Sequence, residues 1–170
     1  MKLVSLLERL EYTCLQGSTD QEVKNVIYDS RKVEEGSLFI CIRGAVVDGH
    51  KFAPDVIAKG AKVLVVEEAV EAPEDVTVIL VKDTRYAMAF ISAAYFGYPA
   101  EKLKTIGITG TKGKTTTTYM VKSILENAGY KVGLIGTIEA IIGDKVIPAK
   151  NTTPESYMIQ EYFHEMVEAG

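Results

Sequence analysis

Short runs of β-branched and other apolar residues alternate with segments of helical periodicity between Val23 and Phe96. This alternation is typical of α/β layers. It predicts strands near 23–28, 38–42, 63–66 and 76–81, and helices near 3–11, 52–59 and 85–96. Gly97-Tyr98-Pro99 follows the last helix and is a turn-forming cluster that we interpret as the end of a domain. The predicted domains are therefore 1–101 and 102–170.

A strand, a glycine-rich loop and an amphipathic helix follow one another in the second domain. Residues 104–109 read as a strand that runs directly into Gly110–Thr116, and the helix that follows ends at Gly129. With a further strand at 132–135, this order predicts a βαβ unit whose two strands are parallel. The apolar positions of the helix are Met120, Val121, Ile124, Leu125 and Ala128.

The last thirty residues predict a hairpin and a final helix. Strands at 138–142 and 146–147 meet at Gly143-Asp144. Pro154 suits the first position of a helix, which makes Thr153 the predicted N-cap. Because sheets of this class commonly have about four to six strands, we expect the second domain to be incomplete. The buried face of the last helix is predicted to comprise Met158, Ile159, Tyr162, Phe163, Met166 and Val167.

Composition and charge narrow the class of protein. The 170 residues include 19 Lys and Arg against 23 Asp and Glu, a net charge of -4, so the chain lacks the basic excess of a charge-driven nucleic-acid binder. The apolar amino terminus is interrupted at Glu8, Arg9 and Glu11, and the apolar stretch 86–96 is shorter than the roughly 20 residues of a membrane-spanning helix. We therefore expect a cytoplasmic protein without membrane insertion.

The cysteines and histidines carry no recognisable site pattern. Cys14 and Cys41 lie in separate apolar segments without metal-ligand spacing, so we predict reduced thiols in the core. His50 and His164 are isolated in the sequence. We predict surface or boundary positions for both histidines and assign no role to either.

The segment from Gly110 to Thr116 has the features of a polyphosphate-binding loop. Glycines at 110 and 113 allow successive backbone N–H groups to point inward and form an anion-binding nest. A helix that opens near Lys114 directs its positive dipole end to the same place. Lys114 can then bridge β- and γ-phosphate oxygens while the Thr115 hydroxyl takes a Mg²⁺ position.

The loop departs from the longer phosphate-loop pattern, because Ile108 stands where that pattern requires glycine. The alternative interpretation is a helix start with incidental glycines. Lys112 is either a second phosphate partner or a solvated charge at the loop tip. Thr116 is a candidate for lining the nucleotide site, since threonine is otherwise a weak helix former in a first turn.

Three segments together resemble the Mur ligase family. Residues 109–116 are similar to its phosphate loop, although Lys112 replaces the usual asparagine. Asp29-Ser30-Arg31 and the residues up to Phe39, with Gly44 and 48–52, resemble its uridine-nucleotide region. The segment 136–154 resembles the branch of the family that adds the third amino acid of the wall peptide. The resemblance spans all 170 residues, which would make about a third of a complete enzyme of this type.

The resemblance implies an α/β fold with a small uridine-nucleotide-binding domain, followed by the start of a Rossmann-like phosphate-loop ATPase domain. It implies an ATP- and Mg²⁺-dependent ligase that joins L-lysine or meso-diaminopimelate to UDP-N-acetylmuramoyl-L-alanyl-D-glutamate through an acyl phosphate. We expect the 170 residues alone to be inactive. The implied ATP site comprises Gly110, Thr111, Lys112, Gly113, Lys114, Thr115 and Thr116, with Lys114 catalytic and Thr115 on the metal. The implied substrate residues are Tyr28, Ser30, Ala45, Val46, Val47, Asn151, Thr152 and Thr153.

Other interpretations of the same residues remain open. Residues 29–31 after a strand make an ordinary turn, in which Asp and Ser bond to their own backbone. Residues 151–154 can cap a helix with no ligand present. Rival functions are a stand-alone uridine-nucleotide-binding module, a general phosphate-loop NTPase or kinase, and the related ligase that adds the terminal dipeptide, D-alanyl-D-alanine.

Overall fold

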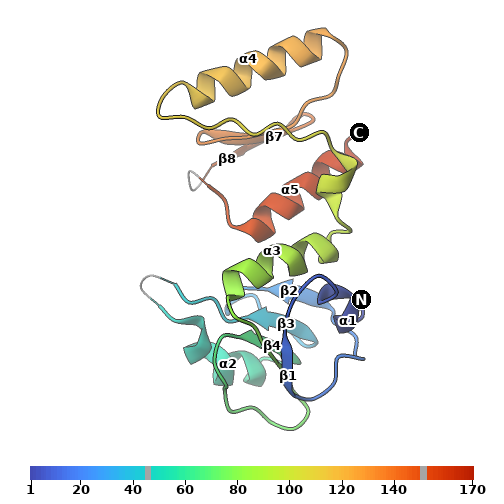
Figure 1. Ribbon diagram of the computed structural model, residues 1–170, viewed down its shortest axis with the longest axis vertical. Helices are drawn as coiled ribbons and strands as arrows, with labels where there is room; N and C mark the ends of the chain where they lie inside the picture. The colour runs from blue at the N-terminus through green and yellow to red at the C-terminus, as the bar shows by residue number, and fades with distance from the viewer. Residues whose placement is uncertain (45–46, 150–152) are drawn as a thin grey trace. The chain divides into compact units, whose positions relative to one another are not determined.

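The computed structural model describes residues 1–44, 47–149 and 153–170, and its chain divides into two compact units, Met1–Tyr95 and Phe96–Gly170 (Figure 1). The division falls close to the Gly97-Tyr98-Pro99 cluster, where Tyr98 has a left-handed backbone conformation with φ 52°. The boundary between residues 101 and 102 stays a prediction. Among the described residues, no helix combines the length and the apolar character needed to cross a bilayer.

The first unit is built on a five-stranded sheet of order β1-β5-β4-β3-β2. Strands β2 to β5 are parallel to one another, and β1 pairs antiparallel with β5 at the edge. Every residue of β3 and β4 is buried, as expected for parallel strands that are covered on both faces. The strands are β1 (Thr13–Gln16), β2 (Asn25–Ile27), β3 (Ser37–Ile40), β4 (Val63–Val66) and β5 (Thr77–Leu80).

Helices cover both faces of this sheet (Figure 1). On one face, Ala53 and Val56 of α2 pack in one cluster with Phe39, Leu64 and Val78 of the strands. On the other face, α3 contacts both α1 and β2. The buried side of α3, including Met88 and Ile91, accounts for its apolar positions. The helices are α1 (Leu3–Leu6), the 3₁₀ helix η1 (Gly49–Phe52), α2 (Ala53–Ala58) and α3 (Thr84–Tyr95).

Two predictions at the amino terminus are wrong. The helix expected at 3–11 covers only Leu3–Leu6, and the strand Thr13–Gln16 was not predicted. The helix stops because the chain must turn to bring Thr13 opposite Leu80 of β5. The strand shows no burial alternation, since three of its four residues are exposed. Only its hydrogen bonds to β5 define it, and these do not leave a pattern in the sequence.

The second unit holds a three-stranded antiparallel sheet of order β6-β7-β8 and the helix α5. The predicted hairpin is confirmed, with Gly143 at φ 56° in the turn between β7 and β8. Ala140 and Ile142 of β7 form a small core with Tyr162 of α5. The elements are the 3₁₀ helix η2 (Pro99–Lys102), α4 (Lys114–Asn127), β6 (Leu134–Ile135), β7 (Glu139–Ile142), β8 (Lys145–Pro148) and α5 (Ser156–Glu168).

The predicted parallel βαβ unit is not formed. Residues 104–109 belong to no strand, and β6 pairs antiparallel with β7. A strand needs a backbone partner, and within the described ranges none lies beside this segment, where Ile106 is 63% exposed. Helix α4 accordingly buries no residue, and Met120 and Ile124 are 61% and 67% exposed.

The predicted start of the last helix is also corrected. Helix α5 begins at Ser156, so Thr153 is not its N-cap and Pro154 lies outside it. The capping position belongs to Glu155, whose backbone is extended with φ -61° and ψ 150° and whose side chain makes no capping bond. Because Glu155 is extended, the first helical turn begins after Pro154, and the proline precedes the helix instead of occupying its first position. Of the predicted buried face, Tyr162 is fully buried and the other members are half-buried.

Candidate functional site

The carboxyl ends of the parallel strands bring several predicted site residues to one edge of the first sheet. Tyr28 and Ser30 follow β2, Val47 follows β3 and Glu67 follows β4. Ligands of open α/β sheets bind at this edge, because the loops that leave parallel strands gather there. Ala45 and Val46, predicted to contact the nucleotide, lie outside the described residues.

The turn after β2 is held by Asp29. Its carboxylate accepts hydrogen bonds from the Arg31 backbone N–H at 3.1 Å and from the Arg31 guanidinium at 2.9 and 2.7 Å. These bonds hold the pKa of Asp29 at about 2, well below its ordinary value of 3.8. The self-bonded turn predicted for Asp29 is therefore confirmed. Ser30 is half-buried, and its carbonyl oxygen accepts from the Lys59 ammonium at 3.1 Å.

The two described flanks of the loop after β3 pair with each other, and Arg43 and Asp48 form a backbone bridge. Gly49 donates to the Ile42 carbonyl at 2.9 Å, and Gly44 donates to the Val47 carbonyl at 3.0 Å. Both glycines are required by close approach: a Cβ on Gly49 would lie 2.7 Å from the Ile42 backbone nitrogen and oxygen, and one on Gly44 would lie 2.8 Å from the Val47 oxygen. Val47 is 50% exposed at the described end of this loop.

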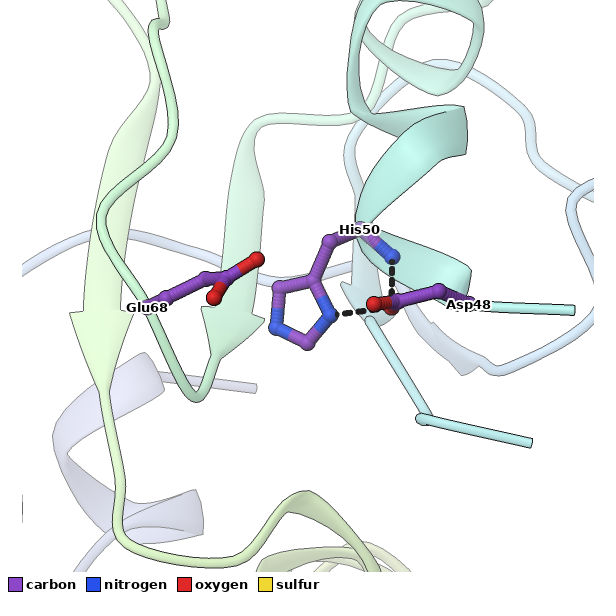
Figure 2. A group of neighbouring side chains, drawn as sticks. All are labelled: Asp48, His50 and Glu68. Carbon is purple, nitrogen blue, oxygen red and sulfur yellow. Dashed lines mark hydrogen bonds and ion pairs between the residues drawn. The ribbon is translucent and has the colours of Figure 1, made fainter. Parts of the chain in front are cut away.

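His50 lies at the centre of a hydrogen-bonded network behind this loop (Figure 2). Asp48 Oδ1 accepts from the His50 backbone N–H at 3.0 Å and lies 2.6 Å from His50 Nδ1. His50 Nε2 accepts the Glu67 backbone N–H at 2.9 Å, which places the proton of a neutral ring on Nδ1. The surface position predicted for His50 is wrong, since the residue is only 6% exposed. The Asp-x-His spacing was the sequence signal that could have revealed the pair.

The same network caps α3 and holds Arg43. Glu67 Oε1 accepts from the Thr84 backbone N–H at 2.9 Å and from its hydroxyl at 2.8 Å. The Arg43 guanidinium lies 3.3 Å from Asp48 and 3.1 Å from Glu68. The bonds from His50 bring the pKa of Asp48 down to about 2.

Asp48, His50 and Glu68 are close enough to suggest a metal site, because their ligand atoms lie within 4.8 Å of one another. Figure 2 shows Asp48 and Glu68 on opposite sides of the imidazole ring. Both ring nitrogens of His50 are already used, one by Asp48 and the other by the Glu67 N–H. The Arg43 guanidinium contacts both carboxylates and offsets part of their negative charge. The arrangement is therefore a structural ion-pair network rather than a metal centre.

In the second unit, the glycine loop opens directly into α4 as predicted. The helix starts at Lys114, and Gly113 occupies the N-cap with φ 80°. Gly110 has φ 154°, so both glycines use backbone geometry that L side chains rarely adopt. Within the described chain no side chain caps this helix, which leaves its first N–H groups facing the loop. Lys114 Nζ donates to the Gly110 carbonyl at 2.6 Å, so the ammonium lies over the loop.

The other loop residues surround this helix start. Thr111, Lys112 and Thr116 are exposed, and Thr115 is half-buried. Thr118 turns its hydroxyl back to the Thr115 carbonyl at 2.7 Å, which is a structural use of a threonine within the helix.

The carboxyl-terminal part of the predicted substrate site is only partly described. Asn151 and Thr152 lie outside the described residues, and Thr153 is exposed.

The cysteines differ in environment, and both are free thiols. Cys41 is buried after β3, and this burial raises its pKa to about 12. Cys14 is exposed on the edge strand β1, so the prediction of a core thiol is wrong there.

A mostly parallel sheet with polar turns at its carboxyl edge, and a glycine loop that opens a helix, are features of α/β nucleotide-binding proteins. Two family models match this chain: "Mur ligase family, catalytic domain" over residues 22–96, and "Mur ligase middle domain" over residues 108–170. The chain belongs to the Mur ligase family.

Relatives and solved structures agree with this assignment. The chain is 54% identical over 170 residues to UDP-N-acetylmuramoyl-L-alanyl-D-glutamate--2,6-diaminopimelate ligase of Clostridium perfringens, and covers 35% of that protein. The protein of the same name from Geobacillus kaustophilus is 44% identical over 170 residues, and 34% of it is covered. The chain thus spans about a third of the length of the relatives it matches.

Among solved structures, a UDP-N-acetylmuramoyl-L-alanyl-D-glutamate--2,6-diaminopimelate ligase superposes on this chain with a TM-score of 0.76 and 22% sequence identity. The superposition covers 100% of this chain and 34% of the ligase chain, and it supports the fold. MurF from Acinetobacter baumannii superposes with a TM-score of 0.63 and 27% sequence identity, and the superposition covers 96% of this chain and 32% of the MurF chain.

Proposed function

We propose that the chain is the amino-terminal portion of an ATP-dependent ligase that joins meso-diaminopimelate to UDP-N-acetylmuramoyl-L-alanyl-D-glutamate. The observation that carries this proposal is the 54% identity, along all 170 residues, to a protein named for that reaction. The two acceptors left open by the sequence were L-lysine and meso-diaminopimelate. The relatives are named as 2,6-diaminopimelate ligases, which favours meso-diaminopimelate.

The glycine loop is the proposed ATP site. The first N–H groups of α4 and the Lys114 ammonium, 2.6 Å from the Gly110 carbonyl, would both face a triphosphate laid across the loop. Apart from Gly113 and its neighbours in the chain, no heavy atom lies within 4 Å of a Cβ built on Gly113, so this side of the backbone is open. Lys114 would stabilise negative charge on the transferred γ-phosphoryl group, and the backbone amides of Gly110–Thr116 would bind the other phosphate groups of ATP.

Magnesium fits the same place. Thr115 stands in the first turn of α4 and offers a hydroxyl oxygen, the type of ligand that Mg²⁺ takes together with phosphate oxygens. The bound ion would supply positive charge that offsets the repulsion between ATP and the substrate carboxylate.

The carboxyl edge of the first sheet is the proposed site of the uridine nucleotide. Ser30, beside the Asp29 turn, and Tyr28 would contact the nucleotide, together with the backbone of residues 45–47. Residues 151–153 would hold the muramoyl-dipeptide end. The position of Tyr28, Ser30 and Val47 at one sheet edge supports this assignment.

A ligation assay tests the proposal. The full-length protein encoded with this chain should release ADP and form the tripeptide product only when the UDP-linked dipeptide and meso-diaminopimelate are both present. The 170 residues alone should form no amide bond. Product formation with L-lysine but not with meso-diaminopimelate would overturn the assigned amino acid, and the absence of product with either would overturn the ligase assignment.

A further inference from the structure

The two described flanks of the loop after β3, residues 43–44 and 47–50, both contact the residues that follow β4. On one flank, Arg43 reaches Glu67 at 3.8 Å and Glu68 at 3.1 Å. On the other flank, Asp48 bonds to His50, and His50 accepts the Glu67 N–H at 2.9 Å. Arg43 and Asp48 also contact each other directly, as a backbone bridge and as an ion pair at 3.3 Å.

The flanks of the loop make several polar contacts although their side chains are only partly buried. Val47 is 50% exposed, and the side chains of Arg43 and Asp48 are 48% and 25% exposed. The described contacts of Arg43 and Asp48 are hydrogen bonds and ion pairs, so these polar contacts hold the described flanks of the loop. Buried His50, 6% exposed, provides the rigid support, because its two ring nitrogens connect Asp48 to the backbone after β4. Well-fixed exposed loops on a rigid scaffold are where binding residues concentrate.

The connection continues into α3. Glu67, whose backbone donates to His50, caps the start of that helix through Thr84. The described flanks of the loop are therefore tied to a strand end and to a helix start, which limits how far Val47 and Asp48 can shift when a ligand binds. Preorganisation of this kind improves affinity because the ordering cost is met before binding.

We propose that Asp48 and His50 are positioning residues for the uridine-nucleotide end of the substrate: they hold the backbone at Val47 in the conformation that binds it. This inference rests on the proposed function. Neither side chain is required to touch the nucleotide. Asp48 acts through two hydrogen bonds from His50, and His50 acts through the Glu67 N–H, so loss of either residue loosens the loop while the sheet beneath it stays folded.

The test compares Asp48→Ala and Asp48→Asn in the full-length ligase. Alanine removes the acceptor for both His50 bonds, whereas asparagine retains a carbonyl oxygen in the same place. Asp75→Ala is the matched control, because it removes another carboxylate of the same unit, paired with Lys62 at 2.8 Å before β4 and β5 and therefore at the opposite edge of the sheet. For each variant, KM for the UDP-linked dipeptide, KM for ATP, kcat and Tm are measured.

Asp48→Ala should raise KM for the UDP-linked dipeptide on the order of tenfold, as expected for the loss of hydrogen bonds to a charged group. KM for ATP and kcat should stay within about twofold, and Asp48→Asn should restore most of the affinity. Asp75→Ala should leave all three constants unchanged.

A second pair of variants separates the two bonds of the histidine. His50→Asn can still donate to Asp48, whereas His50→Gln can still accept from the Glu67 N–H. His50→Asn should have a lower KM for the UDP-linked dipeptide than His50→Gln, because it keeps the bond to Asp48, the residue adjacent to Val47. Equal KM values for both variants and the wild type would overturn the inference.

The inference is also overturned if Asp48→Ala leaves KM for the UDP-linked dipeptide unchanged. It is overturned equally if KM for the UDP-linked dipeptide, KM for ATP and kcat all worsen together in proportion to the loss of Tm, as a purely structural role requires. A wild-type enzyme that shows no saturable dependence on the UDP-linked dipeptide is a different result, because it refutes the proposed function itself.

Discussion

Replacement of Lys114 by alanine should separate activity from stability. The Lys114 side chain is exposed, and its one described bond runs to the Gly110 carbonyl at 2.6 Å. An exposed hydrogen bond of this kind contributes about 1 kcal/mol or less to folding. The variant should therefore unfold within a few degrees of the wild type.

The expected effect on catalysis is much larger. An ammonium about 4 Å from a phosphate charge is worth roughly 4 kcal/mol at an effective dielectric constant of about 20. Loss of most of that interaction in the transition state corresponds to about a 100- to 1,000-fold decrease in kcat/KM. Lys114→Ala should consequently be the most damaging single change among the loop residues.

The assay is steady-state ligation by the full-length protein, with thermal unfolding measured on the same samples. Lys122→Ala is the control: it removes a lysine from the same helix, where the ammonium pairs with Glu126 at 2.6 Å. The control should retain wild-type turnover. If Lys114→Ala kept more than about a tenth of wild-type turnover, the assigned role of this lysine would be wrong.

Three further predictions concern the first unit. At pH 8, iodoacetamide should modify Cys14 in the folded protein and reach Cys41, whose pKa is raised to about 12, only after denaturation; equal labelling of both would contradict the described burial. Gly49→Ala should cost about 1–3 kcal/mol in urea unfolding because its Cβ would lie 2.7 Å from the Ile42 backbone, and an unchanged midpoint would show that the loop is wider than described. The pKa of Asp48 is lowered from 3.8 to about 2, so its contribution to stability is complete above pH 3.8 and is lost as pH falls through about 2. The unfolding free energy of Asp48→Asn should therefore decline less between pH 4 and 2 than that of the wild type, and parallel curves would refute this.

The first sheet could be predicted from local pattern because its strands are continuous apolar runs. The strand at 63–66 is confirmed to the residue, and the helix at 85–96 is confirmed within one residue at each end. The fully buried parallel strands β3 and β4 leave a strong signal, since both of their faces must be apolar. The edge strand at 13–16 leaves none, because its side chains are mostly exposed and only hydrogen bonds to β5 define it.

In the second unit, strand pairing and the start of the last helix could not be predicted from the local sequence pattern. The strand propensity of 104–109 is real, but a strand forms only beside a partner, and pairing is a property of distant segments. Thr153 and Pro154 form a plausible capping sequence, yet the helix begins two residues after the proline. The helix start that forms has no side-chain capping bond, so the local capping pattern did not identify it.

The candidate sites were predictable to different degrees. The start of α4 at Lys114 follows from the glycine loop and the amphipathic segment after it. The Asp48–His50–Glu67 network was not predicted, because Glu67 is 17 residues from His50 and the two meet only when β3 and β4 lie side by side. An isolated histidine in a sequence gives no indication of which backbone N–H it will accept.

Binding of the ATP triphosphate by backbone amides, Lys114 and Thr115 at the start of α4 can be measured by isothermal titration calorimetry of the folded full-length protein with ATP and Mg²⁺. We expect saturable binding with one ATP per chain, strongly weakened in Lys114→Ala and retained in Lys122→Ala. The absence of any binding heat from the well-folded wild-type protein, with no competition against a fluorescent ATP analogue, would contradict it.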